Sequence, residues 1–214
     1  QTGTGTNTLT FNYTVVEGHT STDLNYVATS SLALNSGTIK DAATNDATLT
    51  LPAIDNASSL AGNKALVIDG VTPTITSVTS TSNDGSYMIG DVVPITVTFS
   101  EVVNVVTTSG TPTLTLETGS NDAAVSYTSG TGTNTLTFNY TVLEKHASSN
   151  LDYVATSSLA LNSGTIKDGV GNDASLTLAA PGQANSLGAN KALVIDGVIP
   201  TVTNVSCLLY TSDA

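Results

Sequence analysis

The chain has 214 residues, a formal net charge of −12 and a charged fraction of 10%, against about 25% in an average globular domain. Its five basic residues are all lysines, so it has no guanidinium groups to grip phosphates and no basic stripe, and we expect no nucleic-acid partner. No stretch approaches eighteen consecutive apolar residues, so we expect no membrane insertion by this sequence.

A long internal repeat organises the chain. The stretch GTGTNTLTFNYTV starts at Gly3 and again at Gly130, and the same shift of 127 residues holds without a gap up to residue 206. When 3–79 is aligned with 130–206, 56 of 77 positions are identical. This period is a domain length rather than the length of one solenoid coil. We therefore expect 1–69 to be the C-terminal part of a first repeat, 70–196 to be one complete repeat, and 197–206 to be the first strand of a third.

The last eight residues, 207–214, do not follow the repeat. Their sequence, CLLYTSDA, is compatible after back-translation with the transposon-end adapter used to prepare sequencing libraries. We interpret this segment as translated adapter rather than native sequence, and we assign no biological role to Cys207, the single cysteine of the chain. The chain also begins in mid-repeat, so we expect it to be an internal fragment of a longer protein.

Alternation of apolar and polar residues predicts strands throughout the complete repeat. In chain order they lie near 74–79, 94–102, 111–118, 123–128, 135–142, 151–156, 159–167, 174–178 and 191–195. Turn-forming clusters such as SNDGS, TSGTGTN and DGVGND separate them. Eight or nine short strands with no amphipathic helix predict an all-β fold, an antiparallel immunoglobulin-like β-sandwich, with a closed barrel as the alternative.

The same alternation predicts which side chains form the core of that sandwich. Along each strand the apolar residues share one face and the threonines share the other. The side chains expected to point inward are Ile95, Val97, Phe99, Leu114, Leu116, Leu136, Phe138, Tyr140 and Val142.

Several stretches together carry a family resemblance. They are ITSVTSTSNDGSYMIGDVVPITVTFSEVVNV, GTPTLTLETG, TNTLTFNYTV, GTIKDGVGNDASLTL and NKALVIDGVIPTV. As a set they resemble the bacterial immunoglobulin-like repeats found in tandem in very large secreted or surface-anchored adhesins. The resemblance implies an extender, or stalk, module at the bacterial cell surface or outside the cell. Its partners would be neighbouring repeats of the same chain, while a distal domain would bind an unknown surface ligand.

The few acidic residues are candidates for a calcium site. Calcium takes six to eight oxygen ligands, largely from carboxylates and backbone carbonyls. The candidate ligands are Asp69, Glu101, Asp84, Asp91, Asp168 and Asp196. If the strands alternate in direction, Asp69 and Glu101 meet at one domain junction, and the other four gather at the next. The alternative is that these aspartates cap turns, because Asx side chains hydrogen-bond to nearby backbone.

Other functional classes find less support in the sequence. His19 and His146 occupy the same position in two repeats, each in a hydrophilic loop, and we expect both to be solvated rather than to bind zinc. No nucleophile motif or paired carboxylate suggests an enzyme. Rows of threonine suggest ice binding as an alternative, but a twisted sandwich does not offer the flat array of hydroxyl groups that would match an ice lattice. A glycan- or protein-binding repeat that acts by multivalency remains the alternative function, although the chain lacks tryptophan.

Overall fold

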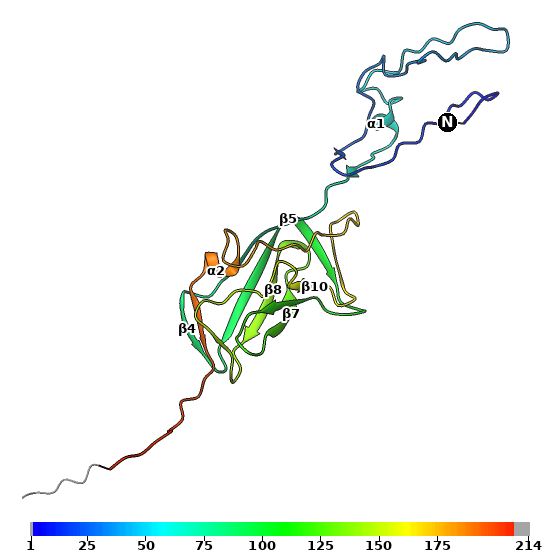
Figure 1. Cartoon of the computed structure of the whole chain (residues 1–214). Helices are drawn as coiled ribbons and strands as arrows, with labels where there is room; N and C mark the ends of the chain where they lie inside the picture. The colour runs from blue at the N-terminus through cyan, green and yellow to red at the C-terminus, as the bar shows by residue number, and fades with distance from the viewer. Residues whose placement is uncertain (1, 208–214) are drawn as a thin grey trace, which may run out of the picture. The chain divides into compact units, whose positions relative to one another are not determined.

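The computed structural model describes residues 2–207 of the chain (Figure 1). Contacts divide the chain into two compact units, Gln1–Thr72 and Pro73–Ala214. Within residues 2–207 both units consist of strands and loops with one helical turn in each, and the sheets are mainly antiparallel, so the predicted all-β class is confirmed. Cys207 is exposed, and the rest of the expected adapter segment lies outside the described residues.

The larger sheet of the second unit is built around one long strand, β5 (Val92–Val106). The other strands of this sheet are β3 (Ile75–Ser80), β6 (Thr113–Leu116), β7 (Ala123–Ser129), β8 (Thr133–Thr141), β10 (Leu159–Ala160) and β11 (Thr165–Lys167). The order is β10-β6-β7-β8-β5-β11, with β3 also paired to β5, and every pair is antiparallel. The first half of β5 pairs with β3 and β8, and its last three residues pair with β11.

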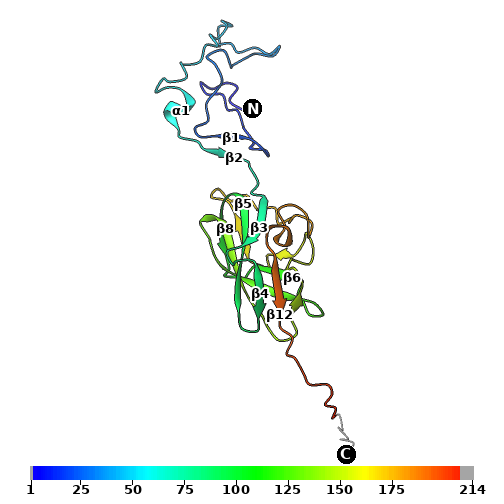
Figure 2. The ribbon, with the colours of Figure 1, turned by 90° about the vertical axis from the view of Figure 1, so that its left-hand side faces the viewer.

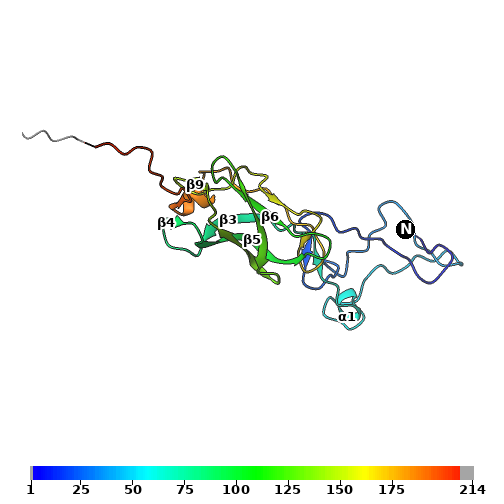
Figure 3. The same cartoon turned by 90° about the horizontal axis from the view of Figure 1, so that it is seen from below.

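The second unit also contains a smaller, three-stranded sheet. In it β12 (Leu193–Asp196) runs parallel to β4 (Gly85–Met88) and antiparallel to β9 (Ala147–Ser148). Figure 3 shows β4 and β9 at the end from which the C-terminal tail departs. The helical turn α2 (Leu187–Asn190) precedes β12 and is capped by Ser186, whose hydroxyl accepts from the amide of Ala189 at 3.2 Å.

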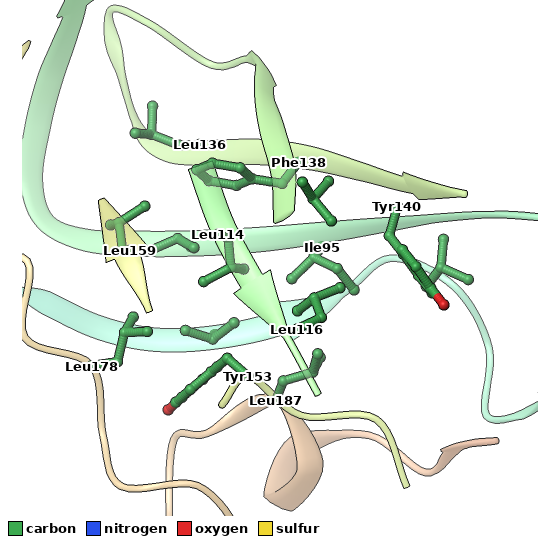
Figure 4. Packing of buried hydrophobic residues seen from close by; sticks show 14 of the residues in the cluster. Ile95, Leu114, Leu116, Leu136, Phe138, Tyr140, Tyr153, Leu159, Leu178 and Leu187 are labelled. Atoms are coloured by element: carbon green, nitrogen blue, oxygen red, sulfur yellow. The ribbon is translucent and has the colours of Figure 1, made fainter. Parts of the chain in front are cut away.

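The core of the second unit lies between these sheets and the loops that close over them (Figure 4). All nine side chains that the alternation predicted to point inward are buried, so this prediction is confirmed. The loops and β12 add further apolar side chains, including Leu151, Tyr153 and Leu187. The hydroxyl of Tyr153 donates to the carbonyl of Ala179 at 2.6 Å, which gives the polar end of this buried ring a partner.

Two predicted strands are wrong, and a third, 159–167, is divided into β10 and β11 by a turn in which the amide of Gly164 donates to Leu161. Residues 151–156 and 174–178 form no strand, although Leu151, Tyr153 and Leu178 are buried. A turn in which the amide of Ser158 donates to Ala155 breaks the first of these segments. The alternation therefore predicted correctly that these side chains are buried, but it did not predict correctly that the segments form strands. The sequence also did not indicate β4, β9 or the helical turn α2.

The first unit keeps the local structure of its counterpart but few strands. It contains β1 (Thr20–Ser21) paired with β2 (Ile68–Asp69), and the helical turn α1 (Leu60–Asn63) capped by Ser59. Its local hydrogen bonds match those found 127 residues later, as for Gly37, whose amide donates to the carbonyl of Leu34 at 2.8 Å, just as that of Gly164 donates to Leu161. Local sequence thus fixes turns and caps even where a sheet is missing.

What the first unit lacks is a covered core. Exposed fractions are 40% for Leu9, 57% for Phe11, 52% for Tyr13 and 43% for Val15. The counterparts of these four residues, Leu136, Phe138, Tyr140 and Val142, are at most 1% exposed. In the second unit those counterparts pack with residues of β3, β5, β6 and β7, and apart from the last two residues of β7 these strands have no equivalent within 1–69.

Candidate cation site at the chain entry

Two acidic residues lie where the chain enters the second unit. Pro73 is buried there, and its carbonyl accepts from the amide of Ser175 at 2.8 Å. The next residue, Thr74, exchanges hydrogen bonds with Ser100, whose amide donates to the Thr74 carbonyl at 2.8 Å. Because Glu101 follows Ser100 in β5, it is held beside this entry.

The second acid, Asp168, comes to the same place from β11. Lys167, the last residue of β11, pairs with Asn104 on β5, and the antiparallel direction carries the next residue, Asp168, toward Glu101. Carboxylate oxygens of Glu101 and Asp168 approach within 4.8 Å of each other, a separation at which both could hold one ion. No ion is part of the structure.

The loop around Asp168 holds its carboxylate in the charged form. Oδ1 accepts from the amides of Val170, Gly171 and Asn172 at 2.6–2.9 Å, and Oδ2 accepts from the side-chain amide of Asn172 at 2.6 Å. Burial opposes ionisation, but these hydrogen bonds outweigh it and hold the pKa of Asp168 below its ordinary value of 3.8. Oδ1 accepts three hydrogen bonds and Oδ2 accepts one, so Oδ2 is the oxygen with room for a cation.

The equivalent loop of the first unit shows which of these features belong to the turn alone. Asp41 also accepts from two backbone amides of its loop and from the side chain of Asn45, and the Asn45 bonds lower its pKa too. The Asx turn therefore explains the hydrogen bonds of Asp168 without any ion. The distinguishing feature is the neighbouring Glu101, which has no counterpart within 1–69.

The predicted second cluster does not form as expected. Asp168 was expected beside Asp84, Asp91 and Asp196, and the structure places it next to Glu101 instead, because β11 pairs with the far half of β5. Within residues 2–207, Asp84, Asp91 and Asp196 do not belong to any group of three acids close enough to share an ion.

Asp91 and Asp196 accept from backbone amides of their own turns, whereas Asp84 accepts from an amide just before β12. Asp84 accepts from the amide of Ala192, Asp91 from that of Met88 and Asp196 from that of Val198, at 2.9–3.1 Å. Asp91 and Asp196 still come near the same residue, since Asp196 pairs with Met88 in the small sheet. Asp84 precedes β4, and Asp91 follows it, so the strand separates the two.

Asp69, the remaining candidate, ends β2 in the first unit. Its Oδ1 accepts from the amide of Val71 at 3.1 Å. Only three residues separate it from Pro73. At about 3.3–3.6 Å per residue, its Cα is tethered within about 14 Å of the Cα of Pro73.

His146 differs from expectation. The predicted solvated loop is wrong for this residue, because His146 is buried and stacks on Tyr140 with 5.7 Å between ring centroids. Its Nδ1 lies 2.9 Å from the Tyr140 hydroxyl and accepts from the amide of Leu143 at 3.3 Å. Burial raises the pKa of Tyr140 to about 12. The backbone of His146 in turn binds Gly197, so this pair anchors the point where the chain leaves the unit.

No family model, curated protein or solved structure matches this chain. The resemblance to bacterial immunoglobulin-like repeats accordingly stays a prediction from the sequence. None of the helices within residues 2–207 is long and apolar enough to cross a membrane.

Proposed function

We propose that this chain is a structural extender of a large bacterial surface-anchored or secreted adhesin, built from tandem immunoglobulin-like repeats of 127 residues. Its role is to hold a distal adhesive domain away from the cell. The observation that carries this proposal is the position of the two chain ends on the complete repeat.

The chain enters and leaves residues 73–196 at opposite ends (Figures 1 and 2). At the entry, Thr74 is bonded to Ser100, next to Phe99 on β5. At the exit, Asp196 pairs with Met88, just before the turn into Val92 at the start of β5. From Val92 to Phe99 the chain of β5 advances by seven residues, which span about 23 Å at roughly 3.3 Å per residue. A module with opposed ends adds its length to a rod when it is repeated.

The linkers favour a stiff rod over a loose chain. Asp69 is followed by Gly-Val-Thr-Pro, and Asp196 by Gly-Val-Ile-Pro, so the proline restricts its own φ and the residue before it in both cases. Gly197 is also held tightly, because its amide donates to the carbonyl of His146 at 2.7 Å and its carbonyl accepts from Lys145 at 2.9 Å. A Cβ at Gly197 would lie 2.2 Å from the carbonyl oxygen of Leu143, which explains the glycine.

Calcium at the chain entry stiffens each junction in this proposal. Glu101 and Asp168 supply two carboxylates, and Asp69, tethered to Pro73, supplies the third. Backbone carbonyls and water complete the six to eight oxygens that calcium takes, and binding in the range of about 10⁻⁴ to 10⁻³ M is typical of extracellular modules. The support is the 4.8 Å approach of Glu101 to Asp168 and the charged state of Asp168.

A test of the extender role uses arrays in which residues 70–196 are joined head to tail. The maximum dimension from small-angle X-ray scattering should rise in proportion to the number of repeats, because each repeat adds the distance between its opposed ends. Arrays whose size grows only with the cube root of mass would show collapsed particles and would rule out a stalk.

Calcium should raise the unfolding free energy of the 214-residue chain. At a calcium concentration ten times the dissociation constant, the gain is about 1.4 kcal/mol, read as a higher melting temperature in calcium than in chelator. Asp69→Asn, Glu101→Gln and Asp168→Asn should each remove most of this gain. Asp196→Asn is the matched control, because Asp196 is the repeat counterpart of Asp69 but no counterpart of Glu101 or Asp168 follows it in this chain. Equal melting curves in calcium and chelator would reduce these aspartates to turn caps.

A further inference from the structure

Two hydrogen bonds converge on one ring nitrogen of His146. Nδ1 accepts from the backbone amide of Leu143 at 3.3 Å and lies 2.9 Å from the Tyr140 hydroxyl. A backbone amide keeps its hydrogen at any ordinary pH, so Nδ1 must be without a proton wherever the Leu143 bond is made. The neutral ring then carries its proton on Nε2, and the Tyr140 hydroxyl donates to Nδ1. The arrangement therefore fits the uncharged imidazole.

The surroundings give a charged ring no partner. His146 is 8% exposed, its ring stacks on Tyr140, and it takes part in no ion pair among residues 2–207. Burying a charge without a partner costs free energy, so both the burial and the Leu143 amide oppose a proton on Nδ1.

Charged side chains lie on all the elements around the ring. They are Asp91 before β5, Glu117 after β6, Asp122 before β7, Glu144 and Lys145 beside His146, and Asp196 at the end of β12. Asp91, Glu117 and Asp196 accept from backbone amides of their own turns. The acids favour a charged ring only through space, where salt screens them, whereas the amide of Leu143 opposes it in direct contact.

The turn formed by residues 143–146, here called the exit turn, holds the point where the chain leaves the repeat. The His146 carbonyl accepts from the amide of Gly197 at 2.7 Å, and the Lys145 amide donates to the Gly197 carbonyl at 2.9 Å. Lys145 has a positive φ of 71°, which is uncommon for a residue with a side chain, so the exit turn depends on the bonds around it. Two of those bonds join Leu143 to His146, one to its backbone amide and one to Nδ1.

We propose that His146 makes the exit turn an acid-released latch, in which protonation of the ring breaks the bond to the Leu143 amide and loosens the hold on Gly197. The latch is closed at neutral pH and opens in mild acid. If the chain is an extender, as proposed above, acid would make the junction that follows residue 196 more flexible.

Acid should favour unfolding of the second unit through this residue. In an unfolded chain histidine takes up a proton near its ordinary pKa of about 6.5, whereas the closed exit turn has no place for that proton. The stability that the neutral ring contributes is therefore present above about pH 6.5 and is lost as the pH falls below it. Between about pH 7.5 and 5.5 the only side chains with an ordinary pKa in range are the two histidines, His19 and His146.

Unfolding of the 214-residue chain at pH 7.5 and pH 5.5, at constant ionic strength and in chelator, tests the proposal. The unfolding equilibrium constant of the second unit should rise about fivefold to tenfold in acid, close to the full effect of a proton that only the unfolded chain binds. His146→Asn places a non-titrating acceptor, Oδ1, where Nδ1 stands, and should remove this dependence. His19→Asn is the matched control and should keep it, because His19 forms the same stack with Tyr13 but is exposed.

Nuclear magnetic resonance of the wild-type chain gives a second measurement that needs no variant. At pH 7.5 the nitrogen-15 shifts of His146 should show Nδ1 without a proton. The hydrogen-exchange protection of the Gly197 amide, corrected for the intrinsic rate at each pH, should fall several-fold between pH 7.5 and 5.5. The Gly70 amide, which donates to the His19 carbonyl at 2.8 Å in the first unit, should change much less.

Several results would overturn the latch. They are an unfolding constant that is the same at both pH values, a pH dependence that survives His146→Asn, a proton on Nδ1 at pH 7.5, and equal loss of protection at Gly197 and Gly70. Because all measurements are made in chelator, none of these results bears on calcium binding, and none depends on the extender role.

Discussion

Phe138→Ala should lower the unfolding free energy of the second unit by about 3–5 kcal/mol, whereas Phe11→Ala should change the unfolding free energy of the chain by no more than about 0.5 kcal/mol. The two residues lie in the same sequence, LTFNYTV, so intrinsic strand propensity is equal at both. Phe138 is fully buried among Leu114, Leu136 and Tyr127, and its ring meets that of Tyr127 edge-on with centroids 6.1 Å apart. Phe11 is mainly in contact with solvent.

Urea denaturation followed by circular dichroism measures both changes. With a total stability of about 5–15 kcal/mol typical for a domain, the Phe138 variant should unfold at a much lower urea concentration, while the Phe11 variant keeps the wild-type midpoint. Equal shifts at the two positions would mean that residues 1–69 hold a closed core after all.

Gly164→Ala should destabilise the second unit by about 1–3 kcal/mol, while Gly37→Ala should be close to neutral. A Cβ at Gly164 would stand 2.5 Å from the carbonyl oxygen of Gly110 and 3.0 Å from the ring of Pro112. Both neighbours belong to the loop between β5 and β6, so backbone must move to admit the methyl group. A Cβ at Gly37, the counterpart, would meet only the carbonyl oxygen of Leu34, at 3.1 Å.

Thermal unfolding of the two glycine variants separates their effects. The melting transition of the second unit should fall for Gly164→Ala and stay in place for Gly37→Ala. Since the turn residues around both glycines are identical in sequence, ALNSGTIKD, a loss at Gly37 would point to a local conformational demand rather than to the close approach of Gly110.

These paired predictions rest on one property of the chain. The same sequence occurs once with and once without the strands that cover it, so each residue of 130–196 has an internal control. Turns, caps and the Asx loop persist in both copies, because their hydrogen bonds close within a few residues. Burial does not persist, because it depends on partners that are distant in sequence.

The sequence by itself determined the repeat, the all-β class and the inward-facing side chains. Period-two alternation is a local property of a half-buried strand, so Ile95, Leu114 and Phe138 were identified without knowledge of their partners. Alternation failed at residues 151–156, where Tyr153 makes only an isolated bridge with Leu116 before a turn begins at Ala155.

Only the tertiary structure decided which acids meet and what the histidine does. Asp168 lies beside Glu101 rather than beside Asp91 because β11 pairs with the far half of β5, and strand pairing is set by long-range contacts that spacing in sequence does not reveal. The stack of His146 on Tyr140 is itself local, because Tyr13 and His19 form the same stack in the first unit. His19 is exposed and His146 is buried, so the burial depends on what the rest of the second unit places over the ring. A hydrophilic loop in sequence can thus supply a buried side chain, because burial depends on what the fold places above it.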